Sequence, residues 1–304
     1  MRVIAQAPAK LNLLLAVEPR IVNGKHPLVS VFTTIGLSDT LVFDFEKGAD
    51  APTLEVHYAQ GIDAFDITPE ENTVLRAAQT FASIFENDAF PVGLEHPHIT
   101  LEKRIPHQAG LGGGSSDAAA VLRVLAQIAG VDLKAHKLVE CARGIGADVP
   151  FFLTQGCALM TGFGDELKEI LPMPHLEIVI VKPAEGVSTK EVYRAFDELR
   201  NMVPVCEPLV DALKGGAAAP DLSAAMTNNL EAASIKMLNT IAIIKEEMNR
   251  CEGVIHAMMA GSGSAVFGIC DHASRAQQVS AHFAEKGYWT CATTTSTASE
   301  PIWR

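Results

Sequence analysis

A glycine-rich stretch in the first half of the chain constrains its fold more than any other feature. Residues 110–116 read Gly-Leu-Gly-Gly-Gly-Ser-Ser, and apolar side chains then recur at helical spacing over residues 118–129. A glycine backbone can bring several N–H groups against a phosphate, and a helix that begins near Ser115 or Ser116 adds its positive end at the same place. The stretch is therefore typical of a phosphate-binding loop that opens a helix.

Two familiar phosphate motifs do not fit these letters. No lysine follows in the Walker manner, and the dinucleotide-binding pattern requires glycine where Ser115 stands. Taken alone, the stretch also fits a flexible loop before a Ser-capped helix.

Two further segments stand out in the sequence. Residues 146–152 place Asp148 at what we expect to be a helix-to-strand corner, with Pro150 keeping Val149 extended. Residues 259–268 form a small-residue turn that enters an apolar strand.

The rest of the pattern predicts a mixture of strands and helices. From Lys10 onward the side chains alternate, so Lys10 and Asn12 share one face of an N-terminal strand. Further strands are predicted over residues 28–35, 40–45 and 99–101. A helix is predicted from Thr68, whose cap precedes a first-turn proline, to Phe85, and another over residues 133–143.

Composition excludes several classes of protein. With 24 Lys and Arg against 36 Asp and Glu, the net charge of −12 disfavours a protein that holds nucleic acid or an anionic membrane by bulk electrostatics. A small anionic ligand needs only local cations and amides. The six cysteines stand singly, and we see neither a secretion signal nor an apolar run long enough for a membrane helix. We therefore expect a cytoplasmic protein of two domains, since 304 residues are hard to fill with one core.

Taken in order, these segments resemble the GHMP kinase superfamily, which includes galacto-, homoserine and mevalonate kinases. Residues 7–13 read Ala-Pro-Ala-Lys-Leu-Asn-Leu and residues 146–150 read Gly-Ala-Asp-Val-Pro, both in the manner of that family. The extra Gly113-Gly114 pair favours the branch that phosphorylates the 2-hydroxyl of a cytidine-diphosphate ester of methylerythritol, in the non-mevalonate route to isoprenoids.

The resemblance implies roles for individual residues. Lys10 and Asp148 would face the accepting hydroxyl, Asp148 as the proton acceptor and Lys10 as the stabiliser of developing negative charge. ATP would be held, with Mg²⁺ near the Ser116 hydroxyl, by the glycine loop and the strand before it. The residues assigned to ATP are Lys103, Arg104, Gly110, Leu111, Gly112, Gly113, Gly114, Ser115 and Ser116.

The acceptor side departs from the family pattern. The family commonly shows Asp-Gly-Tyr-His, whose aromatic ring stacks on cytosine, whereas residues 23–26 here read Asn-Gly-Lys-His. A lysine at position 25 leaves one side of such a stack open, although it could contact a ring face or the diphosphate. Tyr193 is a candidate for the opposite ring. The residues assigned to the acceptor are Asn12, Lys25, His26, Ser188, Thr189 and Tyr193.

The resemblance thus implies an α/β (α+β) protein with a ribosomal S5-like ATP-binding domain over residues 1–162 and a ferredoxin-like substrate domain over residues 163–304. The break lies near residues 160–165, the active site lies between the domains, and the last strand can return to the first domain. We expect ATP and a phosphorylated small molecule as ligands, with no nucleic acid or membrane partner, in a monomer or homodimer. Two alternatives stay open. One is a kinase of another small alcohol, which the replacement of the usual aromatic residue by Lys25 leaves possible. The other is a catalytically silent member of the family that binds a ligand.

Overall fold

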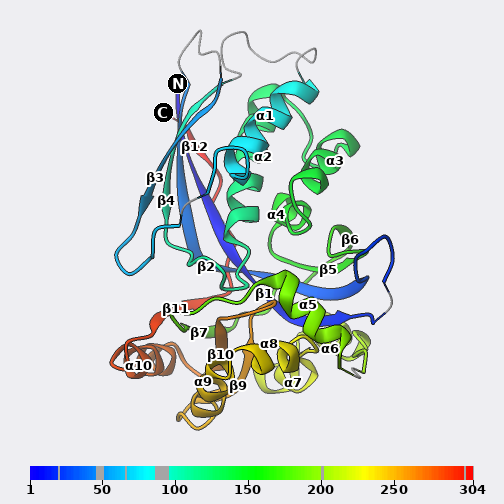
Figure 1. Cartoon of the computed structure of the whole chain (residues 1–304), viewed down its shortest axis with the longest axis vertical. Coiled ribbons are helices and arrows are strands. Elements are labelled where there is room, and N and C mark those ends of the chain that lie inside the picture. The colour runs from blue at the N-terminus through cyan, green and yellow to red at the C-terminus, as the bar shows by residue number, and fades with distance from the viewer. Residues whose placement is uncertain are drawn as a thin grey trace.

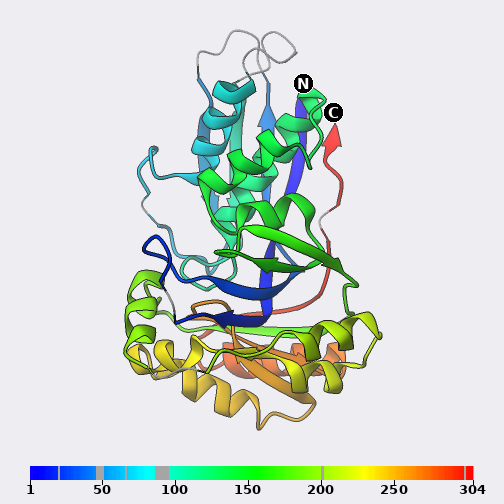
Figure 2. The ribbon, with the colours of Figure 1, turned by 90° about the vertical axis from the view of Figure 1, so that its right-hand side faces the viewer.

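The computed structural model describes residues 1–19, 21–45, 51–65, 67–85, 96–199, 202–297 and 299–303. Within them, two β-sheets lie one above the other along the long axis of the molecule, each with helices packed on it (Figures 1 and 2). The mixed α/β class expected from the sequence is confirmed.

The larger sheet is organised around one long antiparallel hairpin. Its two strands are β1 (Arg2–Val17) and β2 (Leu28–Asp44). The other strands are β3 (Thr53–Tyr58), β4 (His98–Lys103), β5 (Cys157–Thr161), β6 (Glu166–Leu171), β8 (Thr227–Asn228) and β12 (Ile302–Trp303). The order β12-β1-β2-β4-β3 runs along one end, while β5 and β6 extend the sheet from β2 and β8 pairs with β1.

Four helices cover one face of this sheet (Figure 1). They are α1 (Thr73–Phe85), α2 (Gly113–Ala129), α3 (His136–Ile145) and α4 (Val149–Thr154). The most buried is α2, whose apolar side packs against β1 and whose neighbours are α1 and α4.

Two predicted boundaries in this region are wrong. Helix α1 begins at Thr73 rather than at Thr68, because Thr68 lies in a turn and the side chain of Asn72 accepts the N–H of Val74 at 3.0 Å. Residues 146–150 join two helices rather than a helix and a strand. Val149 is helical, since Pro150 stands in the first turn of α4, where its missing N–H costs no hydrogen bond.

The smaller sheet is antiparallel throughout, in the order β11-β7-β10-β9. Its strands are β7 (Glu177–Lys182), β9 (Val254–Met259), β10 (Val266–Cys270) and β11 (Trp289–Thr294). Its helices are α5 (Thr189–Asp197), α6 (Glu207–Lys214), α7 (Ala219–Ala225), α8 (Glu231–Met237), α9 (Thr240–Met248) and α10 (Ala273–Ala284). This order and the crossing helices are the ferredoxin-like arrangement that was expected.

Alternation along β7 explains how the two sheets are joined. Ile178 and Ile180 pack toward the large sheet in a cluster with Leu11 and Ile35, whereas Val179 and Val181 face the helices of the smaller sheet. The smaller sheet is therefore buried on both faces, which accounts for the unbroken apolar run in β7.

The chain passes between the sheets more than once. Strands β5 and β6 both belong to the large sheet, so the expected division after residue 162 falls in the turn between them, and the chain enters the smaller sheet only at Glu177. Later, β8 pairs in parallel with β1 and β12 pairs antiparallel with it, both on the edge of β1 that β2 does not occupy. The division at residues 162 and 163 stays a prediction. Among the described residues, no helix has the length and apolar character needed to span a membrane.

Candidate active site

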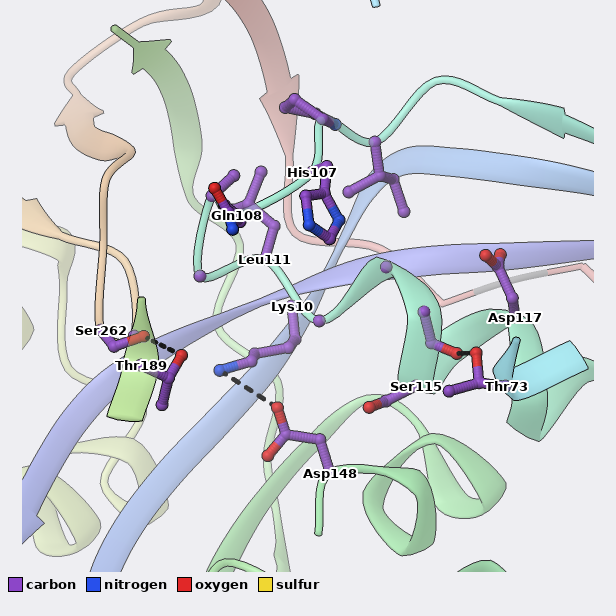
Figure 3. Close-up of a pocket in the computed structure, with 18 of the residues that line it drawn as sticks. Lys10, Thr73, His107, Gln108, Leu111, Ser115, Asp117, Asp148, Thr189 and Ser262 are labelled. Carbon is purple, nitrogen blue, oxygen red and sulfur yellow. Dashed lines mark hydrogen bonds and ion pairs between the residues drawn. The ribbon is translucent and has the colours of Figure 1, made fainter. Parts of the chain in front are cut away.

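A cavity of about 950 Å³ opens where the two sheets meet. Its walls come from β1, from the loop between β4 and α2, from the corner before α4, and from two segments of the second half, residues 187–193 and 261–263. Figure 3 shows side chains from all of these segments pointing toward one space. The sequence segments singled out above are thus brought together.

Lys10 and Asp148 form the polar centre of the cavity. The Nζ of Lys10 lies 3.6 Å from Oδ2 of Asp148 and 4.8 Å from the centre of the Phe32 ring, and a dashed line in Figure 3 marks the ion pair. Lys10 is only 4% exposed, while Asp148 is half-buried at the N-cap of α4. A carboxylate that opens on the cavity next to a desolvated ammonium suits proton transfer and charge stabilisation.

Irregular pairing of the long hairpin helps to aim Lys10. The register between β1 and β2 shifts between Pro8 and Lys10 and again between Asn12 and Leu14. Such bulges bend a strand and redirect its side chains, and they are frequent next to active sites. The predicted sharing of one strand face by Lys10 and Asn12 is confirmed, since both line the cavity.

The glycine loop is held by close contacts on two sides. Gly112 adopts φ +73° just before α2, and a Cβ there would lie 3.0 Å from both the Lys10 and the Phe152 side chains. Gly110 adopts φ +74°, and a Cβ there would lie 2.0 Å from the carbonyl oxygen of Ala260. Only glycine fits at these positions, so the turn at residues 260–263 packs directly against the glycine loop and is more than a tight loop.

The two serines of the glycine loop differ in whether they reach the cavity. Helix α2 begins at Gly113 rather than at Ser115 or Ser116. Ser115 lines the cavity, whereas Ser116 is buried and only 1% exposed. The hydroxyl of Ser116 has no hydrogen-bond partner among the described residues. The structure therefore brings Ser115 to the cavity and does not bring Ser116 there.

Beneath the loop, Lys103 joins two buried carboxylates. Its Nζ donates to Asp117 at 2.8 Å and to Asp39, whose other oxygen accepts the N–H of Ile105 at 2.8 Å. Burial raises the pKa of Asp117 above its usual value, and the charge of Lys103 opposes this shift. Burial alone would lower the pKa of Lys103, but the two carboxylates hold it above its usual value.

The opposite end of the cavity carries aromatic and hydroxyl groups. Tyr193, Ser188 and Thr189 line it as predicted, and the Thr189 hydroxyl lies 2.9 Å from that of Ser262 (Figure 3). Burial, with the charge of Asp148, raises the pKa of Tyr193 to about 12. Phe163, in the β5–β6 turn, adds a second ring at this end.

Besides Ser116, three predicted side chains do not line the cavity. Arg104 is exposed and pairs with Glu102 at 2.9 Å. The Nζ of Lys25 lies 5.6 Å from the centre of the Phe163 ring, and Lys25 itself does not line the cavity. His26 is buried next to Tyr193, and its two ring nitrogens contact the Glu18 carbonyl at 2.9 Å and Asp197 at 3.2 Å. The His26 ring thus supports Tyr193 instead of facing a ligand.

Several cavity residues escaped the sequence reasoning. Phe65 and His107 stack at 3.7 Å between ring centres at the end near β4, and the Thr73 hydroxyl donates to the Gly114 carbonyl at 2.8 Å. Phe163 stands between two glycines in a turn, and this is a local signal in the sequence. No local sequence signal marks Phe65 or Thr73, because only the tertiary fold brings them next to the glycine loop.

Comparison with known proteins agrees with the geometry of the site. The pattern of the GHMP kinases N terminal domain matches residues 72–156, and that of the GHMP kinases C terminal domain matches residues 210–288. The chain belongs to the GHMP kinase family, whose members are ATP-dependent kinases of small molecules.

Similar proteins narrow the branch of the family. The chain is 38% identical, over 93% of its length and 92% of the relative, to 4-diphosphocytidyl-2-C-methyl-D-erythritol kinase of Desulfitobacterium hafniense (strain Y51). It is 34% identical to the kinase of the same name from Bacillus subtilis (strain 168), over 92% of each chain. A crystal structure of 4-(cytidine 5'-diphospho)-2C-methyl-D-erythritol kinase superposes with a TM-score of 0.73 at 32% identity, covering 96% of this chain and 99% of that one.

Proposed function

We propose that this protein transfers the γ-phosphoryl group of ATP to the 2-hydroxyl of 4-diphosphocytidyl-2-C-methyl-D-erythritol, a step in the synthesis of isoprenoid precursors. The observation that carries this proposal is the Lys10–Asp148 pair, 3.6 Å apart at the edge of a glycine loop. Relatives that share 33–38% of their residues with this chain and bear the name of that kinase support the choice of acceptor.

The chemistry follows from the positions of the two side chains. Asp148 accepts the proton of the acceptor hydroxyl as its oxygen attacks the γ-phosphorus, and the bond to the β–γ bridging oxygen breaks to release ADP. Lys10 stabilises the negative charge on the attacking and transferred oxygens, and burial strengthens this effect. The amides at the start of α2 hold the phosphates through their N–H groups and the positive end of the helix.

The residues of this loop also fit Mg²⁺. The Ser115 hydroxyl lies on the cavity, and it lies 3.6 Å from where a Cβ of Gly146 would stand, on the segment that carries Asp148. Mg²⁺ prefers oxygen ligands and commonly takes only one or two of them from the protein. We assign the protein ligand to Ser115 in place of Ser116. When bound, the ion would neutralise the charge of the transferred phosphoryl.

One end of the cavity is proposed to hold ATP and the other the acceptor. The Phe65–His107 stack and Lys103 lie at the ATP end, whereas Tyr193 and Phe163 lie at the acceptor end. Aromatic rings suit a flat base better than an amino acid or a simple sugar. A cytoplasmic location and a monomeric or homodimeric state stay predictions.

A panel assay tests the function directly. Purified protein with MgATP is offered 4-diphosphocytidyl-2-C-methyl-D-erythritol, homoserine, galactose and mevalonate, and ADP release is measured together with phosphorus NMR of the product. We expect ADP release with the first compound only and a new phosphomonoester at its 2-position. Turnover of another alcohol alone would contradict the acceptor, and ADP release with none of the four would favour a silent ligand-binding protein.

A further inference from the structure

A chain of buried hydrogen bonds holds the ammonium of Lys10 from behind. The Nζ of Lys10 donates to Oδ1 of Asn12 at 2.6 Å, and Nδ2 of Asn12 donates to the Ser30 hydroxyl at 2.9 Å. The Ser30 hydroxyl then donates to the carbonyl oxygen of Leu14 at 2.5 Å. The chain thus runs from the candidate active site across the hairpin to the backbone of β1.

The chemistry of the groups fixes the direction of every bond. An ammonium only donates, so Asn12 must turn its amide oxygen to Lys10 and its NH₂ to Ser30. The Ser30 hydroxyl must then accept from Asn12, and its single proton is left for Leu14. Exposed fractions of 4% for Lys10, 1% for Asn12 and 0% for Ser30 leave no room for water to replace a partner.

The same chain lies at a bulge in the hairpin. Asn12 pairs with Phe32 but Leu14 pairs with Val31, so Leu13 is the extra residue in β1. Ser30 bonds Leu14 on one side of the bulge and Asn12 on the other. Ser30 therefore fixes both the orientation of the Asn12 amide and the local shape of the strand that carries Lys10.

We infer that Ser30 is a positioning residue for phosphoryl transfer. It touches no ligand, because it does not line the cavity, and it acts by keeping the amide oxygen of Asn12 on Lys10 and the ammonium near Asp148. Without the hydroxyl, Asn12 loses the partner that selects its orientation, and the ammonium is free to move away from the reacting oxygens. This role rests on the proposed function of the Lys10–Asp148 pair.

Thr33 offers a matched control on the same strand. It is 0% exposed, like Ser30, and it does not line the cavity, but its hydroxyl has no partner among the described residues. Ser30→Ala and Thr33→Val each remove one buried hydroxyl from β2, and only the first breaks the chain to Lys10. Ser30→Thr keeps a hydroxyl at position 30 and serves as the rescue variant.

The first experiment measures kcat and both KM values for the three variants, with melting temperatures to show that each is folded. We expect Ser30→Ala to lower kcat about tenfold with KM for ATP within about twofold, the size set by one buried hydrogen bond. Thr33→Val is expected to match the wild type, and folded Ser30→Thr to recover most of kcat. On an Asn12→Ala background, Ser30→Ala should lower kcat no further. An unchanged kcat in Ser30→Ala, or a full second loss on that background, would overturn the inference.

A second measurement separates this inference from the proposed function. The NH₂ resonances of Asn12 are assigned by their loss in Asn12→Ala, and their hydrogen-exchange rates are compared in the other variants without any acceptor. We expect exchange to be at least about tenfold faster in Ser30→Ala and unchanged in Thr33→Val. Equal protection in Ser30→Ala would refute the positioning role. If the wild type phosphorylates no acceptor but this difference appears, the proposed function fails and the positioning of Lys10 stands.

Discussion

The backbone N–H of Lys10 donates to the carbonyl oxygen of Leu111 at 2.9 Å. This bond joins the strand that carries the candidate catalytic lysine to the loop that is proposed to hold the ATP phosphates. The spacing between the lysine side chain and the loop amides is therefore set by main-chain geometry. Small displacements of reacting groups cost large factors in rate, so such a link contributes to catalysis without touching a ligand.

Asp148→Asn tests the assignment of the base. The amide keeps the size of the side chain but cannot take the hydroxyl proton, so we expect kcat to fall by about 10²-fold or more while ATP affinity stays within a few-fold. Steady-state kinetics with ATP binding measured by calorimetry check both values. A near-normal kcat would show that Asp148 only orients the acceptor.

Gly110→Ala tests the close packing of the turn at residues 260–263 against the loop that is proposed to hold the ATP phosphates. The new Cβ would stand 2.0 Å from the Ala260 carbonyl oxygen, so the loop and the turn at residues 260–263 must separate. We expect ATP affinity to fall at least about tenfold. Gly216→Ala is the control, because Gly216 has a similar φ of +66° but open space around its Cβ. An equal effect of both changes would trace the loss to backbone strain alone.

Lys103→Met tests the buried charge cluster. The change leaves Asp39 and Asp117 buried without their cation, and we expect the free energy of unfolding to fall by about 3–5 kcal/mol. Lys214→Met removes one partner of the exposed Lys214–Glu169 pair and should cost less than about 1 kcal/mol. Urea unfolding followed by circular dichroism gives both numbers. Similar losses of unfolding free energy in the two variants would mean that the buried cluster stabilises the fold no more than an exposed ion pair does.

Phe163→Ala and Phe65→Ala test the two ends of the cavity. Phe163 lies at the end proposed for the acceptor and Phe65 at the end proposed for ATP. We expect the first change to raise KM for the acceptor by about tenfold and to spare KM for ATP, and the second to do the reverse. Reversed or identical effects on the two KM values would contradict the assignment of ATP to the Phe65 end and of the acceptor to the Phe163 end.

Thiol reactivity tests how deeply Cys157 and Cys141 are buried. Burial raises the pKa of Cys157 to about 12 and that of Cys141 to about 11. At pH 8 the thiolate of Cys157 is then present at about one part in ten thousand, so alkylation of the native protein should be far slower than in denaturant. Mass spectrometry after iodoacetamide treatment locates the label. The half-buried Cys206 is expected to react before Cys157, and the opposite order would contradict the packing described.

Local patterns predicted much of the site. The glycine run, the alternation around Lys10 and the segment with Asp148 each have a short-range cause, and the fold brings them to one cavity as expected. Helix boundaries were less predictable. Thr68 and Pro69 have the composition of a helix start, yet Asn72 supplies the cap, because two acceptable caps so close in sequence are separated only by packing.

Other features depend on contacts that no local pattern contains. Phe65 meets His107 only because a loop after β3 returns over the phosphate loop, and Ser30 meets Asn12 only through the register of the hairpin. The assignments of Arg104, Lys25 and His26 to ligands came from their place in the sequence. Their side chains do not line the cavity: Arg104 pairs with Glu102, His26 with Asp197, and Lys25 lies against the ring of Phe163.

The pairing of β8 with β1 has a consequence for how the protein is made. Thr227 and Asn228 bond along Leu14 and Leu15, on the edge of β1 that β2 does not occupy. During synthesis on the ribosome, the strand that carries Lys10 is translated more than two hundred residues before this neighbour exists. The first half of the chain must therefore wait, with an open strand edge beside its future active site, until the second half has been translated and supplies the partner.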